Sequence, residues 1–358
     1  MQKVTNNQIS FLGDISLNGV YNDFYANGLN PFKELEGILD KSKFVIGNLE
    51  CMCEGEKGEN QLKKPRLKTK FETLNLLKKL NLNLALLANN HVYDNLEDGF
   101  NKTINFLRKN NIDFMGAGYT QEEASKPYVK DFDNKQLCVL NYVSKDTNPN
   151  IPKNANVFVN WFDEKKAISE VKLYSSKYDR VIICLHWGGR CEGSYQPDWS
   201  QPNIAKKLID AGANTIIGCH SHTLQPYQVY KGRYIFYSLG NFCFSDIVFN
   251  GKIIELEKGK RTESMIVNAQ LSPKNFSFDF TPFDFTLGPS TINKKIFKKL
   301  KLNNLLFKVI FSNVIFWKLY YIKFKYLDSF MFFLFGNNRN PISQIKKLNF
   351  EKIVRFLR

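Results

Sequence analysis

Short apolar runs alternate with stretches of helical spacing along the first 220 residues. Six of these runs predict β-strands, at residues 9–15, 44–48, 84–88, 137–142, 181–186 and 215–218. Apolar residues that recur at helical spacing predict helices between them, at residues 31–39, 71–80, 96–107 and 204–211. This alternation predicts an α/β fold in which helices cover the faces of a sheet.

The pattern changes after Tyr227. Residues 229–230 and 234–238 flank Lys231-Gly232 and predict a β-hairpin. Residues 264–271 and 276–283 predict two more antiparallel strands, joined through Ser272-Pro273. The main domain, residues 1–289, is therefore expected to close with a β-rich section.

The composition shifts near Ser290 to Lys, Phe, Leu, Ile and Asn, and we assign residues 290–358 to a basic, aromatic helical extension. Within it, residues 296–335 have a helical pattern and many aromatic side chains, among them Phe307, Phe311, Phe316, Trp317, Tyr320, Tyr321, Phe324, Tyr326, Phe330, Phe332, Phe333 and Phe335. Lysines interrupt the run too often for it to span a bilayer. Two alternatives stay open: the extension lies in a membrane interface, or it packs its aromatics on the main domain or a second subunit.

The net charge of +16 is concentrated in the same extension. Residues 291–358 hold 15 Lys or Arg against Asp328 and Glu351, which gives +13 and leaves +3 for the rest of the chain. Such a tail favours an anionic membrane surface, an acidic polymer or nucleic acid, although a solvated basic face is an equal alternative. No recognised nucleic-acid module is present, so we do not expect a nucleic-acid partner.

Cysteine usage and the N-terminus bear on location. Seven cysteines form no disulfide framework, since Cys51 and Cys53 are too close to pair, and Cys138 and Cys184 lie in apolar runs. Residues 1–10 lack the apolar region of a signal peptide. We expect a cytoplasmic protein in a reducing compartment, with peripheral contact at the inner face of the membrane as a second option.

The chain has four histidines, and each follows the end of a predicted strand. Carboxylate and amide side chains stand at strand ends as well, and the full set is Asp14, Glu50, Asn90, His91, His186, His220 and His222. Taken singly, such residues are often helix caps, turn residues or structural histidines. Taken together at the carboxyl ends of strands, they predict a metal-binding cluster, because divalent metals prefer these ligand types.

Several motifs follow one another in the order of a known family. They are Gly13-Asp14, Gly47-Asn48-Leu49-Glu50, Leu87-Ala88-Asn89-Asn90-His91 with Asp94, Gly116-Ala117-Gly118 with Glu123-Ala124 and Lys126-Pro127, His186-Trp187-Gly188, Gly218-Cys219-His220-Ser221-His222, and Ile235-Phe236-Tyr237-Ser238-Leu239-Gly240-Asn241-Phe242. Over residues 9–245 the chain resembles the CapA capsule-synthesis proteins of poly-γ-glutamate-producing bacteria, a branch of the calcineurin-like metallophosphoesterases. The extension lies outside this resemblance.

The resemblance implies a four-layer fold, with two sheets face to face and helices outside, and a two-metal centre. Glu50 stands where the superfamily has its bridging carboxylate. By the same correspondence, Asn90, His186 and His220 complete one metal site, and Asp14 and His222 hold the other. His91 matches a histidine that contacts the phosphoryl group without binding metal. The ligand types suit manganese, iron and zinc alike.

The chain also departs from the superfamily pattern. Ser16 stands where the opening D-x-H motif has its histidine, and the bridging position holds Glu50 in place of Asp. Arg190, close to Glu192, occupies a region where an acidic residue is usual, and we expect it either to bind an anionic substrate group or to face solvent. Asn241 is a further candidate for substrate contact. Asp94 either orients the His91 imidazole or caps the helix that follows it.

These features predict a metal-dependent hydrolase of the phosphoesterase type, using a two-metal-activated water, in capsule or other cell-surface polymer biosynthesis. Its partner would be an anionic substrate or a surface-polymer precursor. The alternative is a non-catalytic, membrane-associated assembly or export factor for an anionic surface polymer. The absent D-x-H histidine favours the alternative, and the presence of His91 favours the enzyme. The oligomeric state is left open.

Overall fold

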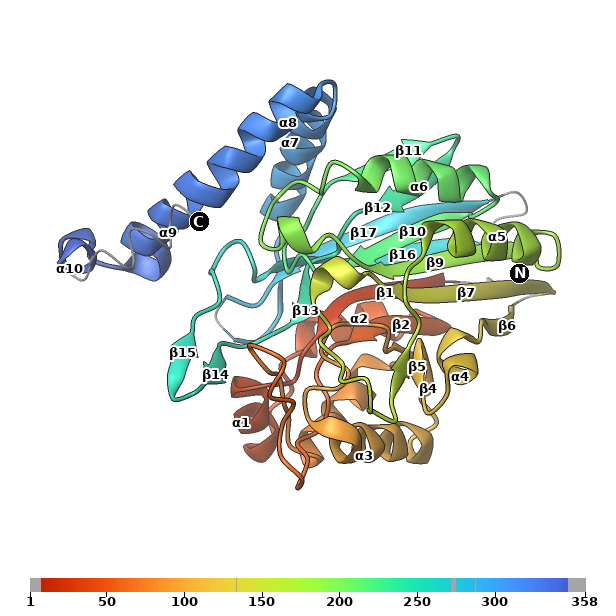
Figure 1. Ribbon diagram of the computed structural model, residues 1–358, viewed down its shortest axis with the longest axis horizontal. Coiled ribbons are helices and arrows are strands. Elements are labelled where there is room, and N and C mark those ends of the chain that lie inside the picture. Colours follow the sequence, from red (N-terminus) through yellow and green to blue (C-terminus); the bar gives the residue numbers. More distant parts are fainter. Residues whose placement is uncertain (1–7, 133, 272–274, 287, 347–358) are drawn as a thin grey trace.

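The computed structural model describes residues 8–132, 134–271, 275–286 and 288–346. Two β-sheets lie face to face, with helices on their outer surfaces (Figure 1). In the described chain the first sheet has eight strands, ordered β18-β17-β16-β1-β2-β3-β4, with β13 paired to β1. They span Gln8–Ile15 (β1), Phe44–Leu49 (β2), Leu84–Leu86 (β3), Asp113–Met115 (β4), Asn241–Cys243 (β13), Glu263–Leu271 (β16), Phe276–Asp284 (β17) and Thr291–Ile292 (β18).

The second sheet has six strands in the described chain, ordered β11-β12-β10-β9-β7-β6. They span Tyr128–Phe132 (β6), Lys135–Val143 (β7), Arg180–His186 (β9), Thr215–Cys219 (β10), Tyr227–Tyr230 (β11) and Arg233–Phe236 (β12). Two small ribbons pair β5 (Ala117–Gly118) with β8 (Phe158–Val159) and β14 (Ile247–Phe249) with β15 (Lys252–Ile254). Strands β1 to β4 are mutually parallel, and so are β7, β9, β10 and β12, so each sheet gathers several carboxyl ends at one edge.

The inner faces of the two sheets share one apolar core. Phe11 and Ile46 of the first sheet belong to the same buried cluster as Val139, Ile182 and Ile217 of the second. Apolar burial on this scale drives the two sheets together.

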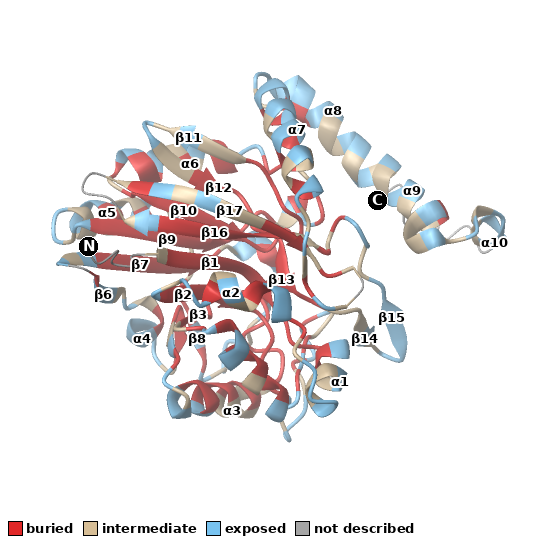
Figure 2. Cartoon of the chain, turned by 180° about the vertical axis from the view of Figure 1, so that it is seen from behind, coloured by how far each residue is buried: buried red, intermediate tan, exposed pale blue. Residues whose placement is uncertain are grey.

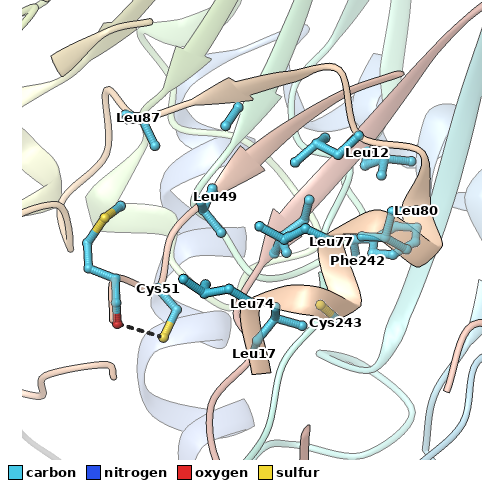
Figure 3. Packing of buried hydrophobic residues seen from close by; sticks show 14 of the residues in the cluster. Leu12, Leu17, Leu49, Cys51, Leu74, Leu77, Leu80, Leu87, Phe242 and Cys243 are labelled. Atoms are coloured by element: carbon cyan, nitrogen blue, oxygen red, sulfur yellow. Dashed lines mark hydrogen bonds between the residues drawn. The ribbon is translucent and has the colours of Figure 1, made fainter. Parts of the chain in front are cut away.

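Helices bury the outer face of each sheet in turn. Those over the first sheet are α1 (Val20–Ala26), η1 (Lys33–Leu35), α2 (Glu36–Leu39), η2 (Glu72–Leu80) and α3 (Leu96–Lys109). Figure 3 shows Leu74, Leu77 and Leu80 of η2 packed near Leu12 and Leu49 of the strands. The second sheet is covered by α5 (Glu164–Ser175) and α6 (Gln201–Asp210). This arrangement of helix, sheet, sheet and helix confirms the predicted four-layer α/β fold.

All six predicted strands of the first 220 residues are present, although β3 ends two residues earlier than expected. The predicted hairpin is β11–β12, and β16 pairs antiparallel with β17; the predicted link through Ser272-Pro273 lies outside the described residues. The helix predicted at residues 71–80 is present as a 3-10 helix, η2, at Glu72–Leu80. All seven cysteines are buried and free.

The C-terminal extension is mostly helical, as predicted. It contains α7 (Lys295–Ile310), α8 (Val314–Ile322), the π-helical segment η5 (Lys323–Asp328), α9 (Ser329–Phe335), η6 (Gly336–Asn338) and α10 (Pro341–Ile345). Strand β18 pairs with β17 of the main sheet, α7 packs against the body, and α8 contacts the body through Trp317, while α9 and α10 lie farther from it (Figures 1 and 2). The predicted domain boundary at residue 290 stays a prediction.

Candidate metal centre

Polar side chains from five parallel strands converge at one buried place. They are Asp14 within β1, Glu50 directly after β2, Asn90 after β3, His186 at the end of β9, and His220 and His222 after β10. Each of these residues is at most 6% exposed. His220 and His222 both have positive φ, 94° and 54°, a conformation that L-residues rarely adopt. The loop after β10 is therefore held in a strained form that turns two imidazoles toward the cluster.

Glu50 is the centre of this cluster. Its side chain is fully buried, and neither carboxylate oxygen has a hydrogen-bond partner among the described residues. Its Oε1 lies 3.7 Å from Nε2 of His91, 3.7 Å from Nε2 of His222 and 3.8 Å from Nε2 of His186. Burial, reinforced by the neighbouring Asp14, raises the pKa of Glu50 well above its usual range. A buried carboxylate with no donor is costly unless a cation neutralises it.

Three possible ligand atoms lie close together beside Glu50. His186 Nε2 is 2.9 Å from Asn90 Oδ1 and 3.0 Å from His220 Nδ1. Burial lowers the pKa of both histidines, that of His220 to about 3, so both imidazoles are neutral. A single proton on His186 Nε2 can form a hydrogen bond with Asn90 Oδ1 or with His220 Nδ1, but not with both. Ligand atoms on one metal with bonds of about 2.0–2.2 Å lie about 3 Å apart, which is the spacing found here.

Asp14 lies on the other side of His186, and both of its oxygens already accept hydrogen bonds. Asn48 Nδ2 donates to Oδ1 at 2.7 Å, and the backbone N–H of His220 donates to Oδ2 at 3.0 Å. His222 Nδ1 is 3.5 Å from Asp14 Oδ2 and 2.8 Å from Asn241 Oδ1. Burial raises the pKa of Asp14. Asp14 is thus a weaker ligand candidate than Glu50, because donors already occupy its oxygens.

His91 and Asp94 form a hydrogen-bonded pair at the edge of the cluster. His91 Nδ1 lies 2.5 Å from Asp94 Oδ2, and that oxygen also accepts from the backbone N–H of Leu67 at 2.7 Å. The cap position of α3 is Asn95, so the alternative in which Asp94 caps this helix is wrong. Asp94 therefore orients the imidazole, with Nε2 facing Glu50.

These residues fit a divalent metal. The two oxygens of Glu50 and Nε2 of His220 are buried without hydrogen-bond partners among the described residues, and Glu50, His220 and His222 offer ligand atoms within 4.8 Å of one another. Asn90 and His186 add an amide oxygen and an imidazole nitrogen on the same side. A donor set of imidazole, carboxylate and amide oxygen suits manganese, iron or zinc, without selecting among them.

A cavity of about 130 Å³ opens onto the cluster, where His91 and His222 form part of its wall. Lys63, Lys64 and Arg261 contribute three cationic groups to the lining. Lys63 is 3% exposed, and its Nζ donates to the carbonyl of Asn148 at 2.8 Å. Arg261 Nη1 lies 3.1 Å from Glu192 Oε1. An anionic group that enters this cavity would meet these cations and the His91 imidazole.

The two candidate substrate-binding residues, Arg190 and Asn241, do not line the cavity. Arg190 is paired with Asp198, with Nε 3.1 Å from Oδ2, exposes 64% of its side chain and does not line the cavity. Asn241 is fully buried; its amide faces His222 and donates to the carbonyl of Arg261 at 2.9 Å. Arg190 is thus the solvent-facing alternative, and Asn241 contacts the His222 imidazole.

Lys63 and Arg261 were not predicted as site residues, and Asn48 was quoted only as part of the motif Gly47-Asn48-Leu49-Glu50. Asn48 lies inside β2, next to the buried Leu49, and the apolar pattern of that strand does not indicate a role for the Asn48 side chain in the site. Lys63 belongs to a Lys-Lys-Pro segment without periodicity, and its burial depends on the path of a long loop. No local sequence signal identifies Lys63 or Arg261 as a site residue.

Residues 8–246 match the family described as "Bacterial capsule synthesis protein PGA_cap". The chain belongs to this family. Among its curated relatives are the PGA biosynthesis protein CapA of Bacillus subtilis (strain 168), 32% identical over 250 residues, and the capsule biosynthesis protein CapA of Bacillus anthracis, 30% identical over 226 residues. The matches cover 66% and 60% of this chain, and 62% and 53% of the two relatives. The PGA_cap match ends before the C-terminal extension.

A comparison with solved structures matches a hypothetical protein from Thermus thermophilus, with a TM-score of 0.48, 14% identity and coverage of 80% of this chain and 99% of that one. A putative 5′-nucleotidase from Staphylococcus aureus has the same TM-score, with 11% identity and coverage of 76% and 53%.

Proposed function

We propose that this PGA_cap protein is a metal-dependent hydrolase of the phosphoesterase type that acts in the biosynthesis of a capsule or another cell-surface polymer. The observation that carries the proposal is the unpartnered, fully buried carboxylate of Glu50 among imidazoles. The names of the two Bacillus relatives, which refer to PGA biosynthesis and capsule biosynthesis, support a role in the synthesis of such a polymer. The substrate would be an anionic precursor of such a polymer.

Glu50, Asn90, His186, His220 and His222 would hold the metal, with Asp14 as an additional ligand. A divalent metal bound there would lower the pKa of a bound water and polarise the ester to be cleaved. The surrounding side chains are buried and exclude bulk solvent, which strengthens every electrostatic interaction at the centre.

His91 would act as a proton donor or acceptor at the leaving oxygen. Asp94 accepts a hydrogen bond from Nδ1, which fixes the tautomer and leaves Nε2 available to a group in the cavity. Lys63 and Arg261 would orient the anionic substrate from the cavity wall. No Ser or Cys nucleophile is needed for this chemistry.

The test is hydrolysis of p-nitrophenyl phosphate and bis(p-nitrophenyl) phosphate after loading with manganese, iron or zinc. Replacement of His91 by Ala should lower kcat by about 10²–10⁴-fold, the usual contribution of a positioned acid or base, while the bound metal remains unchanged. Equal turnover by the variant and the wild-type protein would contradict the role of His91. The absence of turnover of both esters with all three metals would contradict the proposed hydrolase activity.

A non-catalytic assembly factor is the second candidate. Two observations favour it: Ser16 donates to Asn18 where the superfamily motif has a ligand histidine, and the Asp14 oxygens are occupied by donors. In that case the centre would bind metal for structure, and metal removal would lower the melting temperature while no ester is hydrolysed.

A further inference from the structure

The helices of the C-terminal extension carry apolar side chains on two opposite faces. The inward face of α7 presents Ile296, Leu300, Phe307 and Ile310, all buried against the body. Its outward face carries a second apolar stripe at i, i+3, i+4 and i+7 spacing, made of Leu302, Leu305, Leu306 and Val309. These four side chains are 44% to 61% exposed, so the fold of the described chain does not use them.

The same division continues along α8. Trp317 is buried, and its indole N–H donates to the carbonyl of Pro197 at 3.2 Å, while the Tyr320 hydroxyl lies 2.9 Å from Ser194 Oγ. The opposite side of α8 exposes Ile315, Phe316, Leu319 and Ile322, with 49% to 60% of each side chain accessible. The inner contacts fix the helix to the body and so hold this outer apolar side toward solvent (Figure 2).

Positive charge accompanies this apolar surface. Lys301, Lys308, Lys318, Lys323 and Lys325 are exposed on or beside it, and Asp328 is the only acidic residue in the sequence between 291 and 346. A wide apolar surface flanked by lysines is the composition of elements that lie in the headgroup layer of an anionic bilayer. None of the helices in the described part of the chain is long and apolar enough to cross a membrane.

We infer that the outer surface of α7 and α8, defined by Leu302, Leu305, Leu306, Val309, Ile315, Phe316, Leu319 and Ile322 with the five lysines, docks on an anionic lipid surface. Charge selects this occupant over a second copy of the chain, because dimerisation through this face would bring two extensions of +13 together. The inference does not rest on the proposed hydrolase activity.

The extension also contacts the mouth of the metal-centre cavity. Asn337 Nδ2 donates to the carbonyl of Leu256 at 3.0 Å, and Arg339 pairs with Glu255, and both Glu255 and Leu256 line the cavity. Docking of the extension would therefore bring the cavity mouth close to the bilayer.

The experiment is cosedimentation of the full chain with vesicles of phosphatidylglycerol and phosphatidylcholine, compared with pure phosphatidylcholine. The chain should sediment with the anionic vesicles, and added salt should weaken its binding. The charge variant Lys308→Glu/Lys318→Glu should bind at least about thirtyfold more weakly, and the apolar variant Ile315→Gln/Leu319→Gln about tenfold.

Matched controls come from α5, on the far side of the body. Lys165→Glu/Lys172→Glu changes the net charge equally, and Leu173→Gln removes an apolar side chain that is 46% exposed. Both should bind vesicles like the wild-type chain. Equal binding by all variants, or no binding to anionic vesicles, would overturn the inference. So would a dimer in light scattering that Ile315→Gln/Leu319→Gln converts to a monomer without altering vesicle binding.

Discussion

Lys63 carries a positive charge into the wall of the metal-centre cavity. Burial lowers the pKa of its ammonium group, and the negative charges of Asp94 and Glu50 oppose that shift. No carboxylate of the described residues lies within ion-pair distance of it, and its Nζ has one hydrogen bond, to a backbone carbonyl. A buried ammonium with spare donors can bind an anion, and we assign that role to Lys63.

Replacement of Lys63 by Met should therefore raise KM for a phosphoester by about tenfold or more, since hydrogen bonds to charged groups contribute about 1.5–3 kcal/mol. Lys57→Met is the matched control, because Lys57 is exposed and does not line the cavity, and its KM should stay unchanged. Steady-state kinetics on both variants checks the assignment. A similar KM for Lys63→Met and wild type would remove Lys63 from the substrate site.

At the level of single residues, the sequence indicated the ligand candidates because strand ends can be located from apolar runs. Glu50, Asn90 and the histidines all follow such runs directly. Arg190 and Asn241 were assigned to the substrate without a rule of this kind. Their partners, Asp198 and His222, depend on loop paths that only the folded chain determines.

At the level of elements, strand β10, which precedes His220 and His222, packs tightly against the loop that contains Tyr237. A Cβ on Gly218 of β10 would lie 2.0 Å from the carbonyl oxygen of Tyr237 and 2.7 Å from Nε1 of Trp187. Tyr237 belongs to the segment that continues into β13, which pairs with β1 beside Asp14. The two sheets are thereby joined at the candidate metal centre.

Gly218→Ala should thus lower the free energy of unfolding by at least about 2 kcal/mol, because the carbonyl it would strike is backbone and cannot rotate away. Gly37→Ala in α2 is the matched control: nothing lies within 4 Å of its added Cβ. There the exchange should be neutral or stabilising by up to about 1 kcal/mol. Urea denaturation measures both, and equal stabilities would contradict this packing.

The apolar pattern did not determine the type of one helix, and it did not reveal one short strand. Leu74, Leu77 and Leu80 are spaced by three residues, which matches the 3.0-residue turn of a 3-10 helix as well as one side of an α-helix. Strand β13 has three residues and no alternation that could reveal it. Longer runs such as β9 and β16 were predicted to within a residue, because their apolar patterns are sustained.

At the level of the whole molecule, one part of the extension packs against the body and another part is exposed. Ile296 and Leu300 of α7 join the core between the sheets. Phe307 joins the outer core of the second sheet, with its ring 5.3 Å from that of Tyr237. The basic composition near residue 290 therefore does not mark the point where packing against the body ends.

A chain that ends after Ile292 should lose on the order of 5 kcal/mol, since several large side chains of α7 leave the core. That is comparable to the whole stability of a domain, so we expect aggregation or a much lower melting temperature. A chain that ends after Ile322 keeps α7 and Trp317 and should melt close to the full chain. Calorimetry on the two truncations distinguishes them, and equal melting temperatures would show that α7 contributes little.

Metal content, measured by inductively coupled plasma mass spectrometry, decides whether the buried cluster around Glu50 is a metal centre. We expect stoichiometric manganese, iron or zinc in the wild-type protein, loss of that metal in the His220→Ala/His222→Ala double variant, and retention in His91→Ala. Wild-type protein that binds none of these ions, even after incubation with each, would contradict this expectation.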